Sequence, residues 1–176
     1  SAVEALTWLW INSSEKKWSD ILLEQFSLHS LAPETKIQKE ASLISLSGNR
    51  IDFRNWYTLT IDGSDAKDLD DAISLAAYPD GAMLLGVHIA DVAQYVHEGT
   101  PLDKEAYTRA TSVYTPGKVI PMLPEKISND LCSLHPGWPK VTLSCLMRVN
   151  PEGEVLQADI VEGIIESQKK GVYEDI

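Results

Sequence analysis

A dense group of carboxylates lies in the middle of this 176-residue chain. Between positions 62 and 71 the sequence places five aspartates, namely Asp62, Asp65, Asp68, Asp70 and Asp71. Carboxylates this close repel one another, and a folded chain keeps several of them ionised only when cations or water separate them. The cluster therefore predicts a metal site with oxygen ligands.

The spacing of the aspartates excludes a calcium loop of the helix-loop-helix type. Counted from Asp62, its third, fifth, sixth and twelfth positions would be Ser64, Ala66, Lys67 and Ile73. These residues do not supply the set of oxygen ligands, glycine and glutamate that such a loop requires. A magnesium site remains, because Mg²⁺ needs few carboxylates and completes its octahedron with waters and substrate phosphates. The alternative is a solvated acidic turn, since Asp and Gly are ordinary turn residues.

Apolar segments with strand character flank the aspartates on both sides. Residues 58–61 alternate like a half-buried strand, and residues 72–75 begin another apolar segment. We therefore expect the carboxylates to be held at the end of a rigid framework.

The other patterns predict an α+β fold with mainly antiparallel strands and flanking helices. Two hairpins are expected, one from residues 73–77 and 82–89 around the turn 78–81, the other from residues 141–149 and 155–165 around the turn 150–153. Thr100 is expected to cap a helix that starts at Pro101, with Glu105 and Arg109 one turn apart. Residues 1–50 are expected to form a helical segment, capped at Ser19, and a polar connector.

The charge of the chain limits how it can hold a nucleic acid. The formal net charge is −11, from 26 acidic and 15 basic residues, and the basic residues are scattered. A domain that bound nucleic acid chiefly by neutralising phosphates would be basic. If the chain handles nucleic acid, metal ions must bridge its carboxylates to phosphate, and other parts of a larger protein must supply the cationic track.

The remaining reactive side chains give little support to other chemistry. Cys132 and Cys145 form no disulfide framework and have no zinc spacing, so we expect a reducing compartment and a cytoplasmic protein, with Cys145 buried in a strand. The four histidines are far apart, and His88 is expected to be packed rather than catalytic. No apolar stretch is long enough to predict a membrane span.

Residues 61–72 closely resemble the aspartate signature of the ribonuclease II / ribonuclease R family, in its RNB catalytic domain. The resemblance continues through ordered blocks at residues 88–96, 99–103, 111–114, 119–125 and 131–134, and covers roughly residues 50 to 173. Several blocks in the same order are far more specific than one motif. Residues 51–176 are thus identified as the N-terminal part of an RNB-like catalytic domain.

The resemblance implies a processive exoribonuclease that degrades single-stranded RNA from the 3′ end and releases nucleoside 5′-monophosphates. By motif position, Asp62, Asp68, Asp70 and Asp71 would bind magnesium or manganese, and Asp70 and Asp68 would be catalytic. Asp65 is left outside this set. Tyr114 matches an aromatic residue that stacks on the terminal base. The alternative for Tyr114 is an ordinary strand tyrosine in the core.

Parts of the family pattern are changed or missing. Asn129-Asp130 stands where the family usually has Asn-Gly, so a residue less tolerant of positive φ replaces a glycine. The family's downstream half, with a further aromatic residue, a glutamate and arginines, and its RNA-binding domains are not found here. Because the chain also begins with Ser1, we expect a piece of a longer protein, weak or inactive in isolation.

Two other functions stay open at this point. One is a catalytically inactive RNB-like module that binds RNA or protein, although all four signature aspartates are present. The other is an unrelated acidic metal-binding domain, which would require the ordered blocks to match by accident.

Overall fold

The computed structural model describes residues 49–115 and 118–175. The helix and connector expected within residues 1–50 therefore lie almost entirely outside the described residues. In the described part, no helix is long and apolar enough to cross a membrane.

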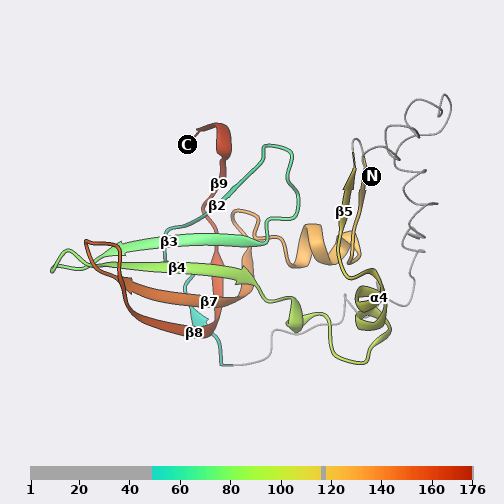
Figure 1. The fold of residues 1–176 in the computed structure, drawn as a ribbon, viewed down its shortest axis with the longest axis horizontal. Coiled ribbons are helices and arrows are strands. Elements are labelled where there is room, and N and C mark those ends of the chain that lie inside the picture. The colour runs from blue at the N-terminus through green and yellow to red at the C-terminus, as the bar shows by residue number, and fades with distance from the viewer. Residues whose placement is uncertain (1–48, 116–117, 176) are drawn as a thin grey trace, which may run out of the picture.

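Seven strands form one sheet in the order β1-β8-β7-β4-β3-β2-β9 (Figure 1). They are β1 (Ile51–Asp52), β2 (Thr58–Asp62), β3 (Asp71–Ala77), β4 (Met83–Ala90), β7 (Pro139–Val149), β8 (Val155–Glu166) and β9 (Lys169–Val172). Only β1 with β8 and β2 with β9 pair in parallel, and the other neighbours are antiparallel. The predicted α+β class with mainly antiparallel strands is confirmed.

A small hairpin, the α-helix, the π-helical segment and one 3₁₀ turn lie beyond one end of this sheet, and a second 3₁₀ turn follows β9 near the C-terminus (Figure 1). The hairpin consists of β5 (Val113–Thr115) and β6 (Lys118–Ile120), and the single α-helix of the described residues is α4 (Pro101–Arg109). A π-helical segment spans Ile127–Leu131, and short 3₁₀ turns span Val92–Gln94 and Tyr173–Asp175.

The expected hairpins and the expected helix start are present. Gly81 at φ +85° and Gly153 at φ +87° close the two hairpin turns in a conformation that favours glycine. Thr100 caps α4, because its hydroxyl accepts a hydrogen bond from the Asp103 amide. Glu105 and Arg109 form the expected ion pair within the helix.

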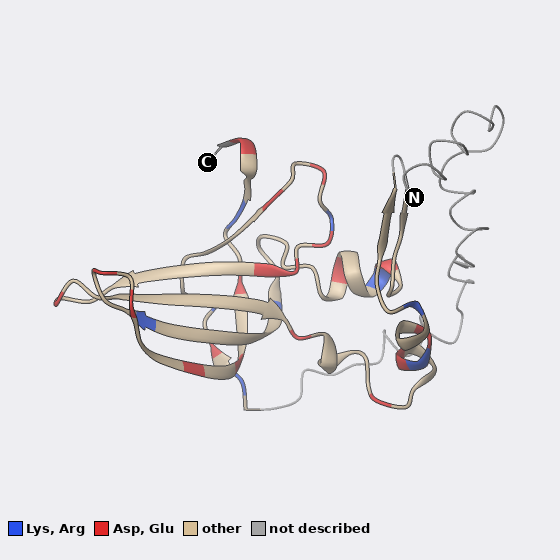
Figure 2. Cartoon of the chain, in the orientation of Figure 1, with Lys and Arg blue, Asp and Glu red and all other residues tan. Residues whose placement is uncertain are grey.

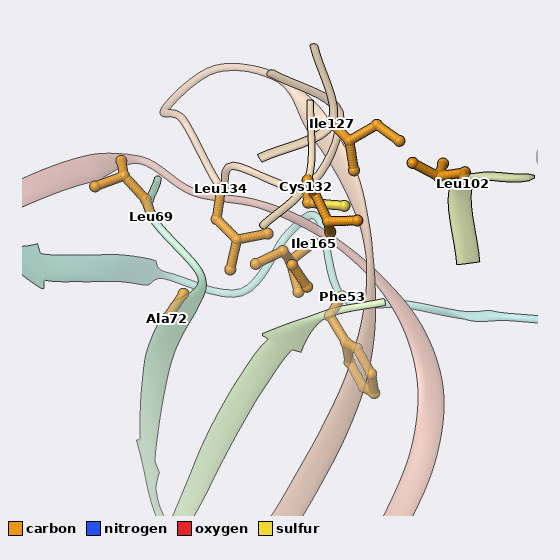
Figure 3. Packing of buried hydrophobic residues seen from close by; sticks show 10 residues of the cluster. Phe53, Leu69, Ala72, Leu102, Ile127, Cys132, Leu134 and Ile165 are labelled. Atoms are coloured by element: carbon orange, nitrogen blue, oxygen red, sulfur yellow. The ribbon is translucent and has the colours of Figure 1, made fainter. Parts of the chain in front are cut away.

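The main hydrophobic core lies where the sheet end meets the helical segments (Figure 3). Leu69, Leu102, Ile127, Leu134 and Ile165 are each at most 2% exposed there. Leu69 comes from the loop that carries the aspartates, so burial of this side chain fixes the loop to the core.

One face of the sheet buries polar side chains, and the opposite face exposes apolar ones. Ser74, His88 and Ser144 lie on the buried face, and Leu143 and Ile160 on the opposite face are 48% and 71% exposed. Cys145 shares the strand face of Leu143 and is only partly buried, so its expected burial is wrong. The polar side chains on the buried face can be buried because they bond to one another, as His88 does with two serines.

Candidate active site

The pairing of two strands places the four predicted metal-binding aspartates at one end of the sheet. Asp62 is the last residue of β2 and Asp71 the first residue of β3, and these strands are antiparallel neighbours. Asp68 and Asp70 lie in the connecting loop just before β3. Figure 2 shows the acidic positions gathered along this loop and at the start of β3. The expected framework is therefore confirmed.

Leu69 sets the direction of the two aspartates on either side of it. Its side chain is fully buried, whereas Asp68 is only partly buried and Asp70 is exposed. Anchoring Leu69 in the core thus leaves Asp68 and Asp70 on the side of this segment that solvent can reach. The Ala90 amide holds the Asp70 carbonyl oxygen at 2.9 Å, which ties this segment to the end of β4.

Lys170 on β9 supports the outer part of the loop. Its ammonium group donates hydrogen bonds to the carbonyl oxygens of Ser64 at 3.1 Å and Ala66 at 2.8 Å. β9 runs parallel to β2, with Asp62 opposite Val172. The Lys170 charge favours the ionised form of Asp62 and partly offsets the repulsion from other carboxylates.

The carboxylates influence one another electrostatically. Removal of water raises the pKa of Asp62, and the charges of Asp71 and Asp68 raise it further. Asp70 keeps contact with solvent, yet its surroundings remove enough water to raise its pKa. The charges of Asp68, Asp71 and Asp62 add to this effect. All four predicted residues thus act on one another, and a nearby cation would relieve their repulsion.

The chemistry of these side chains fits a divalent cation. The Oδ2 atom of Asp62 is buried and has no hydrogen-bond partner. A buried carboxylate oxygen normally has a partner, and a hard cation is a suitable one. Across residues 49–115 and 118–175, no three His, Cys, Asp or Glu side chains are already grouped so as to hold one ion. Water and phosphate oxygens would therefore have to complete any coordination shell.

Tyr114 lies next to these aspartates, although it comes from the separate β5–β6 hairpin. Its hydroxyl donates a 2.6 Å hydrogen bond to Oδ2 of Asp68, which is the main reason that the pKa of Tyr114 rises to about 12. The side chain is 65% exposed, so the alternative of a core tyrosine is wrong. The exposed ring is available to a ligand beside the carboxylates, and its role in RNA binding stays a prediction.

Two cavities meet at the contact between Asp68 and Tyr114. The larger, of about 650 Å³, lies between the aspartate loop and the β5–β6 hairpin and includes Lys67 and Asn129. The smaller, of about 240 Å³, adds Asp70 and the apolar side chain of Met122. Their combined size is in the range of small-ligand sites.

Two serines line both cavities and were not identified from the sequence. Ser112 and Ser128 accompany Asp68 and Tyr114 in each. Ser112 lies two residues before Tyr114, inside a block that resembles the family, and this position was the one available signal for it. Ser128 had no comparable signal, since it reaches the site only through the fold.

The replacement of Gly by Asp130 creates no backbone strain. Asp130 lies in the π-helical segment Ile127–Leu131, and Ala110 is the only non-glycine residue with positive φ in the described part of the chain. The glycine of the usual family pattern is therefore not required here for positive φ.

Comparison with known proteins now decides the family. The family sequence model of the RNB domain matches residues 50–176. The chain belongs to the RNB family. It is 51% identical over 127 residues to Ribonuclease R 1 of Lactococcus lactis subsp. lactis, a match that covers 72% of this chain and 16% of that relative. The RNB chain thus spans only a small part of the relative's length.

Two solved structures have the same fold as this chain. The RNase R of Mycoplasma genitalium, solved with double-stranded RNA, superposes with a TM-score of 0.80 at 30% identity and covers 88% of this chain and 28% of that one. Yeast Ssd1, described as a pseudonuclease, gives a TM-score of 0.66 at 22% identity over 84% of this chain and 17% of its own. The second likeness shows the fold alone.

Proposed function

We propose that this RNB chain supplies the metal-binding carboxylates of a magnesium-dependent exoribonuclease. The enzyme would degrade single-stranded RNA processively from the 3′ end and release nucleoside 5′-monophosphates. The observation that carries the proposal is the placement of Asp62 and Asp71 at the adjoining ends of β2 and β3, with Asp68 and Asp70 in the loop between them and close enough for the other three charges to act on Asp70. Relatives named ribonuclease R support it.

The four aspartates would hold the cations, magnesium or manganese. Divalent ions bound there would activate a water and stabilise the leaving 3′ oxygen of the RNA. Asp70 and Asp68 are the residues we expect to matter most for hydrolysis, because Leu69 directs both away from the core. The exposed ring of Tyr114, beside Asp68, would stack on the terminal base.

The charge of the chain supports a role for cations in binding RNA. With a net charge of −11, the chain would repel a phosphate backbone, and bound divalent ions would reverse this locally. The cationic track for the rest of the RNA would come from other parts of the full-length protein. The expected location is the cytoplasm, where Cys132 and Cys145 would remain reduced, as they are in the structure.

The proposal is tested with the full-length protein and RNA labelled at its 5′ end. With Mg²⁺ we expect the labelled RNA to shorten from its 3′ end to a small core, and a chelator should stop this. Asp70→Asn should lower the rate at least ~100-fold, because a carboxylate that holds the ion loses its charge. Asp159→Asn on β8 removes the same charge from an exposed position and should keep the wild-type rate. Unchanged turnover in Asp70→Asn would refute the assignment.

The second candidate is a module that binds RNA or protein without hydrolysis. The observation that favours it is the shared fold of Ssd1, whose description is a pseudonuclease, since the fold is evidently compatible with loss of activity. This candidate predicts RNA or protein binding that is independent of divalent metal, and intact RNA with and without Mg²⁺. The same assay therefore separates the two functions.

A further inference from the structure

The backbone around Asp68 needs an external support. The loop from residue 63 to residue 70 contains no helix or strand, and its internal support is a turn in which the Ala66 amide bonds to the Gly63 carbonyl oxygen at 3.1 Å. Mutual repulsion of the carboxylates would spread such a loop. Residues that tie it down therefore decide where its aspartates point.

The fully buried hydroxyl of Ser133 joins the two backbone groups on either side of Asp68. It accepts a 2.9 Å hydrogen bond from the amide of Leu69 and donates a 2.7 Å hydrogen bond to the carbonyl oxygen of Lys67. A single side chain thus fixes the peptide units before and after Asp68. The bond from the Leu69 amide is buried and the bond to Lys67 is partly buried, so the loss of the buried bond is costly.

The neighbouring backbone continues this connection. The Leu134 amide donates a 2.8 Å hydrogen bond to the carbonyl oxygen of Leu69, and both side chains are fully buried. Ser133 therefore holds the Leu69 amide, and the Leu134 backbone holds the Leu69 carbonyl oxygen.

The serine itself is held in place by the turn that precedes it. The Ser133 amide donates a 3.2 Å hydrogen bond to the carbonyl oxygen of Asp130. The Cys132 amide donates a 2.8 Å hydrogen bond to the carbonyl oxygen of Ile127. Cys132 and Ile127 are buried in the main core (Figure 3). The support for Asp68 is thus connected directly to the packed interior.

We propose that Ser133 is a positioning residue that fixes the direction of Asp68 and Asp70. It touches neither substrate nor metal, and acts through the backbone at Lys67 and Leu69. The inference rests on the proposed function, because direction matters only if these carboxylates bind the cations. Removing the hydroxyl should raise the Mg²⁺ concentration needed for activity and lower kcat, and leave the KM for RNA unchanged.

The first test is Ser133→Ala in the full-length protein, with rates measured over a range of Mg²⁺ concentrations. We expect the Mg²⁺ midpoint to rise and kcat to fall by roughly 10- to 100-fold, as for other small displacements of catalytic groups. Ser144→Ala is the matched control, because its hydroxyl is equally buried but bonds to His88 and Thr142. An unchanged midpoint and kcat in Ser133→Ala, or equal changes in Ser144→Ala, would overturn the proposal.

If the alanine variant does not fold, Ser133→Cys replaces the hydroxyl by a weaker donor of similar size and should show the same changes.

The second test needs no activity. Hydrogen exchange of the Leu69 amide, followed in full-length protein without metal, should be slow and should become at least ~10-fold faster in Ser133→Ala. Fast exchange at Leu69 in the wild type would overturn the support by Ser133. If Leu69 is protected but the wild type shows no metal-dependent hydrolysis, the proposed function fails and the hydrogen-bonded support stands.

Discussion

At the scale of single residues, the site depends on alternation around one leucine. Leu69 is buried and its two aspartate neighbours are not, so a single apolar anchor gives both carboxylates the same general direction. Tyr114 adds a fixed contact from another part of the chain through its bond to Asp68. The hydroxyl of Tyr114 bonds to Asp68 and its ring is expected to stack on a base, so substitutions can distinguish the two roles.

Tyr114→Phe and Tyr114→Ala should have different effects on RNA binding. The phenylalanine keeps the aromatic face and loses only the hydrogen bond to Asp68, so the affinity for RNA should change little. The alanine removes the ring and should weaken binding by roughly 1–3 kcal/mol, the usual range for stacking on one base. Both are measured by fluorescence anisotropy of labelled single-stranded RNA, with Asp70→Asn present so that the RNA stays intact.

Equal weakening in the two Tyr114 variants would contradict this expectation. That result would assign the effect to the hydroxyl and its bond to Asp68. Full affinity in both variants would remove Tyr114 from the RNA-binding residues.

At the scale of elements, three strands are joined through one buried histidine. His88 on β4 bonds through Nε2 to Ser74 on β3 at 2.9 Å and through Nδ1 to Ser144 on β7 at 2.8 Å. A neutral imidazole has one donor and one acceptor, and the two hydroxyls can match either arrangement. The predicted packing role of His88 is confirmed by its complete burial.

This histidine should make stability depend on pH. Burial lowers the pKa of His88 from 6.5 to about 4, so the unfolded chain takes up a proton that the folded chain excludes. The stabilisation is complete above pH 6.5 and is lost as the pH falls towards 4, by at most about 1.4 kcal/mol per pH unit. Thermal midpoints measured between pH 7 and pH 5 should fall, and His88→Gln should flatten the dependence.

His97→Gln is the control for this measurement. His97 is an exposed histidine outside the sheet, so its replacement should keep the wild-type dependence on pH. A slope that is identical in wild type and His88→Gln would show that His88 does not carry the effect.

The strands also show what sequence patterns can and cannot predict. The pattern of alternation, apolar runs and turn residues correctly located β2, β3, β4, β7 and β8 and placed aspartates at strand ends. It did not predict which face is buried, because a polar face whose groups bond to one another can be buried as readily as an apolar one. The bonds of Ser133 and Tyr114 to the aspartate loop were equally unpredictable, since they join residues 46 to 66 positions apart. No local pattern records such contacts.

At the scale of the whole molecule, the described part of the chain has an exposed apolar face. Leu75 on β3, Ile89 on β4, Leu143 on β7 and Ile160 on β8 are between 46% and 71% exposed, and the strand register places them on the same side of the sheet. Contiguous apolar surface of this kind is uncommon on monomeric proteins. The net charge of −11 acts against it, because like-charged molecules repel.

These two properties predict that the isolated 176-residue chain associates with itself as salt is added. Salt screens the repulsion between acidic chains and leaves the attraction between apolar faces, so the mass measured by sedimentation velocity should rise from low to high ionic strength. Ile160→Lys should reduce the association, because it places a charge on the apolar face.

Gln157→Lys is the matched control, since it adds the same charge to the same strand at a position facing the other side of the sheet. A chain that stays monomeric at every salt concentration would show that this face does not drive association, and equal effects of the two lysines would assign the change to net charge alone.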